Sequence, residues 1–200
     1  MSVVPTIDLR GHLADVGDQI DVACRDIGFF QIVGHDLDPF VESRAWDAAH
    51  EFFALPEADK PACSIPPGDA YGYGPYLVER LAASLGADTP PDLKETFSIG
   101  PFVVPAGALD DPAAAFVYSP NRWPPAMPHM AGTFHAYYDA LADLVERVMQ
   151  AMAVGLGLDD EWFAPFIDRH TSALRILHYP DLRGRRVESG QLRAGAHADY

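Results

Sequence analysis

The chain has 200 residues, which is long enough to bury one sizeable hydrophobic core and too short to require a second domain. Hydrophobic residues make up 48% of the chain and charged residues 22%, as in ordinary globular proteins, so the composition argues against intrinsic disorder. The formal net charge is -15, and a surface this acidic repels nucleic-acid phosphates and anionic membranes, so neither is an expected partner.

The N-terminal part of the chain alternates short apolar strands with amphipathic helices. Residues 3–9 are a strand candidate, and residues 13–27 carry apolar side chains three or four positions apart, which is typical of a helix with one buried face. Gly28 suits the position directly after the helix end. Residues 29–33 predict a second strand, and residues 39–54 predict a second helix that follows an N-capping aspartate.

The rest of the chain predicts a long helix between two regions of shorter elements. Residues 61–125 are rich in proline and glycine, which favours loops and short strands wrapped over a core. An apolar stripe predicts a helix over residues 128–154. Residues 173–179 and 191–200 then predict strands, so a β-rich region begins near the end of the sequence.

The two cysteines, Cys24 and Cys63, have no metal-binding spacing. Cys24 falls on the apolar face of the first predicted helix, so we expect a buried free thiol. No signal peptide and no transmembrane-length apolar run are evident. Together these observations predict a reduced, cytoplasmic compartment.

The pair His197 and Asp199 is the strongest indication of chemistry in the chain. One residue separates the two within a predicted strand, so both side chains lie on the same strand face. An imidazole and a carboxylate side by side are two of the three ligands of the facial triad that binds Fe(II) and leaves positions open for O2. A motif this short also occurs on ordinary surfaces. No candidate for the second histidine follows before Tyr200.

A series of further motifs in the same order resembles the isopenicillin N synthase-like family of Fe(II)/2-oxoglutarate-dependent oxygenases. The resemblance covers nearly the whole chain, and its ordered segments are residues 4–9, 26–35, 52–57, 93–100, 121–124, 174–180 and 195–199. It implies an α+β fold, with a double-stranded β-helix (jelly-roll) core, flanking helices and an apparent truncation after the first metal-ligand strand. It also implies an N-terminal oxygenase region over residues 1–125. Residues 126–200 would hold the support helix and first jelly-roll strands, within one compact unit.

The resemblance further implies Fe(II), O2 and 2-oxoglutarate as the cofactor and cosubstrates of a dioxygenase that hydroxylates, desaturates or cyclises a small-molecule substrate. His197 and Asp199 match the first two iron ligands of the family. Tyr179 matches a tyrosine that hydrogen-bonds the 2-oxoglutarate carboxylate in many members. Arg175, Leu177 and Tyr179 would share one face of their strand, since strand side chains alternate.

Residues that contact the substrate are less sharply indicated. Arg175 and Leu177 are candidates from the strand, and Arg175 is able to hold a substrate carboxylate. Tyr71 and Tyr73 are candidates for the pocket entrance, although packing of an aromatic loop explains them equally well. Arg193 is better explained as a solvated charge at a strand edge.

The sequence departs from the family pattern at two points, which leaves two alternative functions open. Many plant members have asparagine at the position of Leu177. The leucine of this chain favours an iron oxidase that works without 2-oxoglutarate, as isopenicillin N synthase does. The second histidine and the Arg-x-Ser motif of the family do not occur after Asp199. A chain that ends at Tyr200 would instead be a non-catalytic fragment or interaction module with unpaired strand edges. The sequence does not indicate an oligomeric state.

Overall fold

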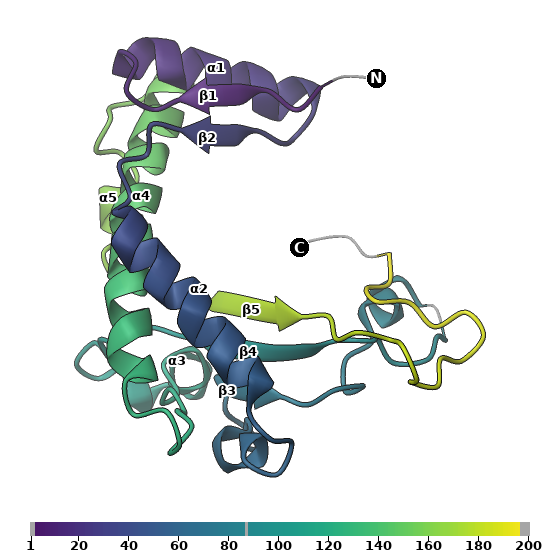
Figure 1. Ribbon diagram of the computed structural model, residues 1–200. Coiled ribbons are helices and arrows are strands. Elements are labelled where there is room, and N and C mark those ends of the chain that lie inside the picture. Colours follow the sequence, from purple (N-terminus) through teal and green to yellow (C-terminus); the bar gives the residue numbers. More distant parts are fainter. Residues whose placement is uncertain (1–2, 87, 197–200) are drawn as a thin grey trace. The chain divides into compact units, whose positions relative to one another are not determined.

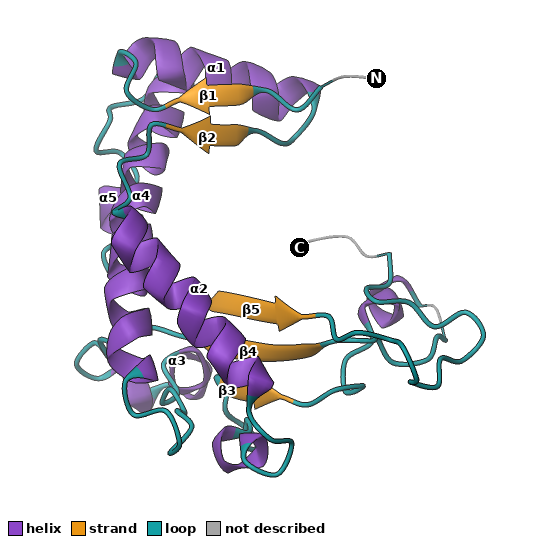
Figure 2. Ribbon diagram, in the orientation of Figure 1, coloured by secondary structure: helices purple, strands orange, loops and turns teal. Residues whose placement is uncertain are grey.

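The computed structural model describes residues 3–86 and 88–196 of the chain. Helices and short strands both occur (Figures 1 and 2), so the expected α+β class is confirmed. No helix among the described residues is both long enough and apolar enough to cross a membrane.

The contacts within the chain divide it into two units, which we describe separately. The first unit contains Met1–Trp46 and Gly132–His170, and the second contains Asp47–Ala131 and Thr171–Tyr200. Each unit therefore combines segments from both sides of residue 125, where the sequence suggested a boundary.

The first unit begins with a β-α-β arrangement. Strand β1 (Thr6–Asp8) pairs in parallel with strand β2 (Gln31–Val33), and helix α1 (Leu13–Asp26) connects them. Gly28 follows the helix in a left-handed conformation with φ 79°, and its N–H donates to the carbonyl of Ala23. The expected glycine stop of this helix is confirmed.

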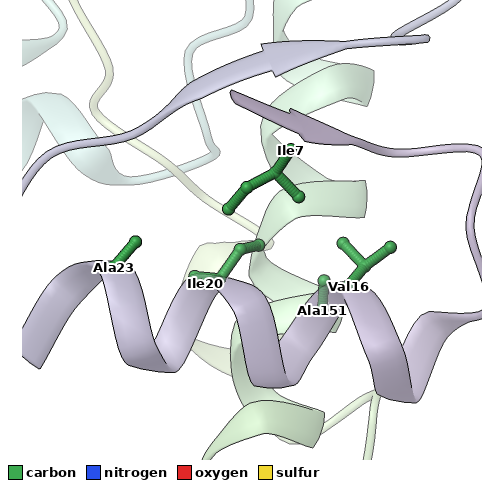
Figure 3. Close-up of a cluster of buried hydrophobic side chains, with 5 residues drawn as sticks. All are labelled: Ile7, Val16, Ile20, Ala23 and Ala151. Atoms are coloured by element: carbon green, nitrogen blue, oxygen red, sulfur yellow. The ribbon is translucent and has the colours of Figure 1, made fainter. Parts of the chain in front are cut away.

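A small apolar cluster fills the space between α1 and β1 (Figure 3). Ile7 points from β1 towards α1, which contributes Val16, Ile20 and Ala23. Ala151 joins them from helix α4. All five side chains are at most 3% exposed, so the cluster is a dry core that the hydrophobic effect stabilises.

Helices α1 and α4 (Met130–Gly155) approach each other closely at two glycines. A Cβ atom on Gly17 would lie 2.6 Å from the carbonyl oxygen of Ala151 and 2.7 Å from the backbone nitrogen of Gly155. A Cβ on Gly155 would lie 2.4 Å from the carbonyl oxygen of Gly17. Neither position has space for a side chain, so backbone packs directly against backbone.

The remaining helices that the apolar pattern predicted lie close to their expected positions. Helix α2 spans Pro39–Ala54, and Asp38 accepts a hydrogen bond from the Phe40 N–H at 2.8 Å, as an N-cap does. Helix α4 begins two residues later than expected and ends one residue later. Helix α5 (Ala164–Ile167) follows it as a single short turn.

The second unit contains a three-stranded antiparallel sheet in the order β3-β4-β5. Strand β3 spans Gly72–Gly74, β4 spans Glu95–Ile99 and β5 spans Leu174–His178. The central strand β4 pairs Phe97 with Ile176 on β5. The described part of this unit also contains short helical segments, which are η1 (Lys60–Cys63), η2 (Leu81–Leu85), η3 (Ala108–Asp110) and α3 (Pro112–Val117).

Aromatic side chains form the core of the second unit. Phe52 from α2 is fully buried and contacts the ring of Phe97 edge to face, with 4.7 Å between the ring centroids. The rings of Phe52 and Tyr73 meet in the same manner at 5.7 Å. Phe53 stacks on the His178 imidazole at 4.8 Å. These contacts hold α2 against one face of the sheet.

Two expectations from the sequence are wrong within the described residues. Residues 191–196 form no strand; in place of regular pairing, they make separate hydrogen bonds to residues 91–93, which precede β4. Cys24 is exposed, although we expected it to be buried. The neighbouring Ala23 takes the buried position in the apolar cluster instead.

Candidate functional site

The two faces of β5 have different surroundings. Ile176 and His178 point to the side of the sheet that α2 covers, as the His178–Phe53 stacking shows. Arg175 and Leu177 alternate with them and lie on the opposite side. We call this side, together with Tyr179, which directly follows the strand, the open face of β5. The sequence predicted that Arg175, Leu177 and Tyr179 share a strand face. The alternation of β5 confirms this for Arg175 and Leu177, whereas Tyr179 lies just beyond the strand end, so its place on that face stays a prediction.

Large side chains on the open face of β5 remain accessible in the described part of the chain. Leu177 is 41% exposed and Tyr179 is 39% exposed. The neighbouring positions on β4 are Thr96, which pairs with Leu177, and Ser98, which pairs with Arg175. Thr96 is only 2% exposed, so the accessible groups of the open face are the aliphatic Leu177, the Arg175 guanidinium and the hydroxyl-bearing Ser98 and Tyr179.

Charged groups of opposite sign meet beside the open face. Arg175 forms an ion pair with Glu79, and the Lys94 Nζ atom lies 3.1 Å from the other oxygen of that carboxylate. The Lys94 side chain is 1% exposed, so Glu79 supplies the counter-charge that a buried ammonium requires. Partial burial lowers the pKa of Arg175 below its ordinary value.

The segment that leads to His197 is attached to residues that lie just before β4. The side-chain amide of Gln191 donates to the Pro91 carbonyl at 2.8 Å, and the Leu93 N–H donates to the Leu192 carbonyl at 2.9 Å. A third contact reaches the end of β5, because Arg193 Nη1 donates to the Tyr179 carbonyl at 3.3 Å. The Arg193 side chain thus links this segment to the backbone of Tyr179.

His197 and Asp199 themselves lie outside the described residues, so their assignment as iron ligands stays a prediction. Among the residues that the structure describes, no three His, Cys, Asp or Glu side chains form a group that could hold a metal ion. The donor set of the terminal pair, one imidazole and one carboxylate, suits Fe(II).

A buried polar network occupies the other side of the sheet. Glu95 accepts hydrogen bonds from Tyr73 at 2.6 Å and from Lys60 at 3.2 Å, and its Oε1 atom lies 2.8 Å from His178 Nδ1. Burial by itself raises the pKa of Glu95, but these hydrogen bonds outweigh burial and keep that pKa below its ordinary value. Burial and the hydrogen bond to Glu95 raise the pKa of Tyr73.

Tyr71 and Tyr73 are both buried, with 4% and 3% of their surface exposed. The Tyr71 hydroxyl donates to the Val117 carbonyl at 2.7 Å, and its ring occupies the space where a Cβ on Gly100 would be. The Tyr73 hydroxyl belongs to the Glu95 network on the face opposite Leu177. We therefore leave both tyrosines out of the proposed substrate surface.

Sequence reasoning did not single out Lys60 and Glu95, which are 2% and 4% exposed. A signal for Glu95 was present, because it begins the run Glu95–Gly100, whose other residues are apolar, hydroxylic or glycine, and a charge buried with such a run must be paired. Lys60 had no such signal, since it follows a loop and looks like an ordinary surface lysine.

Comparison with known proteins places this fold in a defined group. Residues 4–126 match the family model described as the N-terminal region of the non-haem dioxygenase in morphine synthesis. The 2-oxoglutarate-dependent dioxygenase citB of Monascus ruber is 32% identical over 214 residues, which cover 98% of this chain and 62% of citB. The chain therefore spans about three fifths of the length of this relative.

Solved structures give the same result. The crystal structure of a full-length Neurospora crassa protein in complex with alpha-KG superposes with a TM-score of 0.77 and 28% identity, and the match covers 99% of this chain and 61% of that protein. A putative 2OG-Fe(II) oxygenase family protein of Caulobacter crescentus has a TM-score of 0.75 and 27% identity, and the match covers 90% of this chain and 57% of that one. The fold described above is therefore the fold of these proteins over the part that the chain spans.

Proposed function

This chain belongs to the isopenicillin N synthase-like superfamily of 2-oxoglutarate/Fe(II)-dependent dioxygenases, and from that premise we propose that its protein oxidises a small-molecule metabolite with Fe(II), O2 and 2-oxoglutarate. Relatives with this chemistry include a protein named Validamycin A dioxygenase, from Streptomyces hygroscopicus subsp. limoneus. A second structure of the Neurospora crassa protein contains thymine together with alpha-KG. The substrate class proposed for this chain goes no further than a small molecule.

Each proposed site residue has a separate role. His197 and Asp199 hold the iron, which when bound supplies the coordination positions for O2 and 2-oxoglutarate. Tyr179 donates its hydroxyl to a 2-oxoglutarate carboxylate from the open face of β5. Arg175 and Leu177 line the substrate surface beside it, with Glu79 keeping the Arg175 guanidinium oriented. The protein positions the reactants while the metal centre carries out the oxidation.

The observation that carries this proposal is the convergence of two segments of the chain. Arg193, four residues before His197, donates to the backbone of Tyr179 at 3.3 Å. A metal pair and a cosubstrate-binding tyrosine must lie within one ligand length of each other, because 2-oxoglutarate would contact both. The hydrogen bond between these segments supports that proximity.

Replacement of a metal ligand tests the iron assignment directly. We expect His197→Ala and Asp199→Ala each to abolish substrate-dependent succinate formation and to lower Fe(II) affinity, measured by anaerobic titration of the protein at its full natural length. His129→Ala is the matched control, since His129 is an exposed histidine whose side chain is 49% accessible. Wild-type turnover and iron content in either ligand variant would contradict the assignment.

Tyr179→Phe tests the cosubstrate role. Loss of one hydrogen bond to a charged group costs about 1.5–3 kcal/mol, so the apparent 2-oxoglutarate affinity should fall about ten- to a hundred-fold. Iron affinity should remain close to that of the wild type. An unchanged 2-oxoglutarate titration would remove Tyr179 from the site.

A second candidate function is an iron oxidase that needs no 2-oxoglutarate, and Leu177 is the observation that favours it. Leu177 presents an aliphatic side chain on the open face, where it offers no hydrogen bond to a cosubstrate. Oxygen consumption measured with substrate, with and without 2-oxoglutarate, separates the two. Turnover that is independent of 2-oxoglutarate would favour this second candidate.

A further inference from the structure

Asp92 is a buried carboxylate that the proposed chemistry does not use. It is 2% exposed and directly precedes the Leu93–Gly100 run that contains β4. One oxygen accepts a hydrogen bond from the Leu81 N–H at 3.0 Å, and the other accepts one from the Gly195 N–H at 3.0 Å. A single side chain thus joins the start of η2 to the segment that leads to His197.

Gly195 is confined on a second side. A Cβ atom at this position would lie 2.9 Å from both the Cβ atom and the backbone nitrogen of Ala82 in η2. The residue is buried, and its N–H is already directed at Asp92. The backbone of Gly195 is therefore held between a carboxylate that binds it and a helix that blocks its movement.

Residues 91–93 together bind residues 191–195 through hydrogen bonds. Pro91 accepts from the Gln191 side chain, Asp92 accepts from Gly195, and Leu93 donates to Leu192. Residues 91–93 therefore set the position of the later segment at several points, of which Gly195 is the last before the metal pair.

The charge of Asp92 is suited to this task. Both of its partners are N–H donors, so each carboxylate oxygen acts only as an acceptor, and charged acceptors form the stronger hydrogen bonds. Lys94 Nζ lies 3.8 Å from the Leu81-bound oxygen and supplies a counter-charge. An asparagine here would turn an NH2 group towards one of the two N–H donors and lose that bond.

We propose that Asp92 is a positioning residue for the iron site, acting through the backbone of Gly195. This inference rests on the proposed function, in which His197 is a metal ligand. Gly195 precedes His197 by two residues, a span of at most about 7 Å of extended chain, so a fixed Gly195 limits where the imidazole is placed. Groups that orient metal ligands typically contribute about 10–100-fold to metal affinity.

The test compares Asp92→Asn with Asp111→Asn in the protein at its full natural length. Asp111 is a matched control, because it is an exposed carboxylate that accepts a backbone N–H at 2.9 Å, from Ala113 at the start of α3. We expect Asp92→Asn to lower Fe(II) affinity about 10–100-fold, and Asp111→Asn to leave it unchanged. Fe(II) affinity of Asp92→Asn within about twofold of the wild type would overturn the proposal, since the expected loss is at least about tenfold.

Two further readouts separate positioning from general stability. With Co(II) in place of iron and at saturating metal, the ligand-field absorption of Asp92→Asn should differ from the wild type, whereas a purely stabilising residue would leave it unchanged. Amide hydrogen exchange of residues 190–196 should accelerate in the same variant. If Asp92→Asn does not fold, Gly195→Ala, which displaces the segment against Ala82, should produce the same spectral change, and a wild-type spectrum would overturn the proposal.

The outcomes also distinguish this proposal from the proposed function. A wild-type protein that binds neither Fe(II) nor Co(II) contradicts the function and the positioning role together. A wild-type protein that binds iron normally, alongside an Asp92→Asn variant with the same affinity and spectrum, contradicts only the positioning role.

Discussion

The apolar cluster between α1 and β1 and the Glu95 network beneath β4 are both buried, yet different interactions hold them. The cluster contains only aliphatic side chains, with Ile7 and Ile20 each 1% exposed. The network encloses a lysine and a glutamate that are 2% and 4% exposed. Apolar contacts are non-directional and tolerate small changes of shape, whereas a buried charge requires each of its partners in place.

This difference teaches where each unit is vulnerable. Replacing a whole buried ion pair with apolar residues is often harmless, but removing one partner leaves the other charge unpaired. The first unit should instead lose stability where backbone packs against backbone and no side chain can adjust, as at Gly17 and Gly155. The changes below probe these two modes of failure, in order of expected size.

Glu95→Gln should produce the largest loss of folding stability. It leaves the Lys60 ammonium buried without its main counter-charge, which destabilises by about 3–5 kcal/mol. Chemical denaturation of the wild type and the variant measures this loss. The double variant Lys60→Met with Glu95→Leu should recover part of it, since no buried charge remains. A single variant as stable as the wild type would show that the network is not essential.

Gly17→Ala should cause the next largest loss of stability, about 1–3 kcal/mol. Its Cβ would clash with backbone atoms of α4 and force the two helices apart. Gly132→Ala is the matched control. It lies in α4 with nothing within 4 Å of the added Cβ, so it should stabilise by about 0.5–1 kcal/mol. Thermal melts of both variants that shifted in the same direction would contradict the close approach of α1 and α4.

Acidification should weaken the second unit by less than loss of Glu95 does. The pKa of Glu95 lies below its ordinary value of 4.5 in the folded chain, so the unfolded state takes up a proton first. The stabilisation is therefore complete above pH 4.5 and is lost as the pH falls through the lower folded pKa. Amide exchange at β4 should accelerate over this range in the wild type, and the acceleration should be absent in Glu95→Gln.

Arg25→Ala should have the smallest effect. Arg25 pairs with Asp21 one helical turn earlier, at 2.8 Å, but its side chain is 72% exposed. Water and salt screen such a pair, so we expect no measurable change in the unfolding midpoint. A clear destabilisation would mean that surface charges on α1 contribute to the first unit as much as its apolar cluster does.

Helices were predictable from the sequence because their signals are local. Apolar spacing alone placed α1 and α2 nearly to the residue, and the N-cap Asp38 and the left-handed Gly28 mark ends that depend on neighbouring residues only. The ordered motifs of the family were equally readable. They indicated the superfamily, which the family model and the relatives confirm.

Only the tertiary structure decided which side chains are buried and which partners they contact. Cys24 is exposed beside the buried Ala23, and Tyr73 turns away from the open face into the Glu95 network. Residues 191–196 were predicted to be part of a strand, yet they bond singly to residues 91–93. Pairing, burial and counter-charges depend on partners as many as 103 positions away in the Asp92–Gly195 contact, and no local pattern specifies those partners.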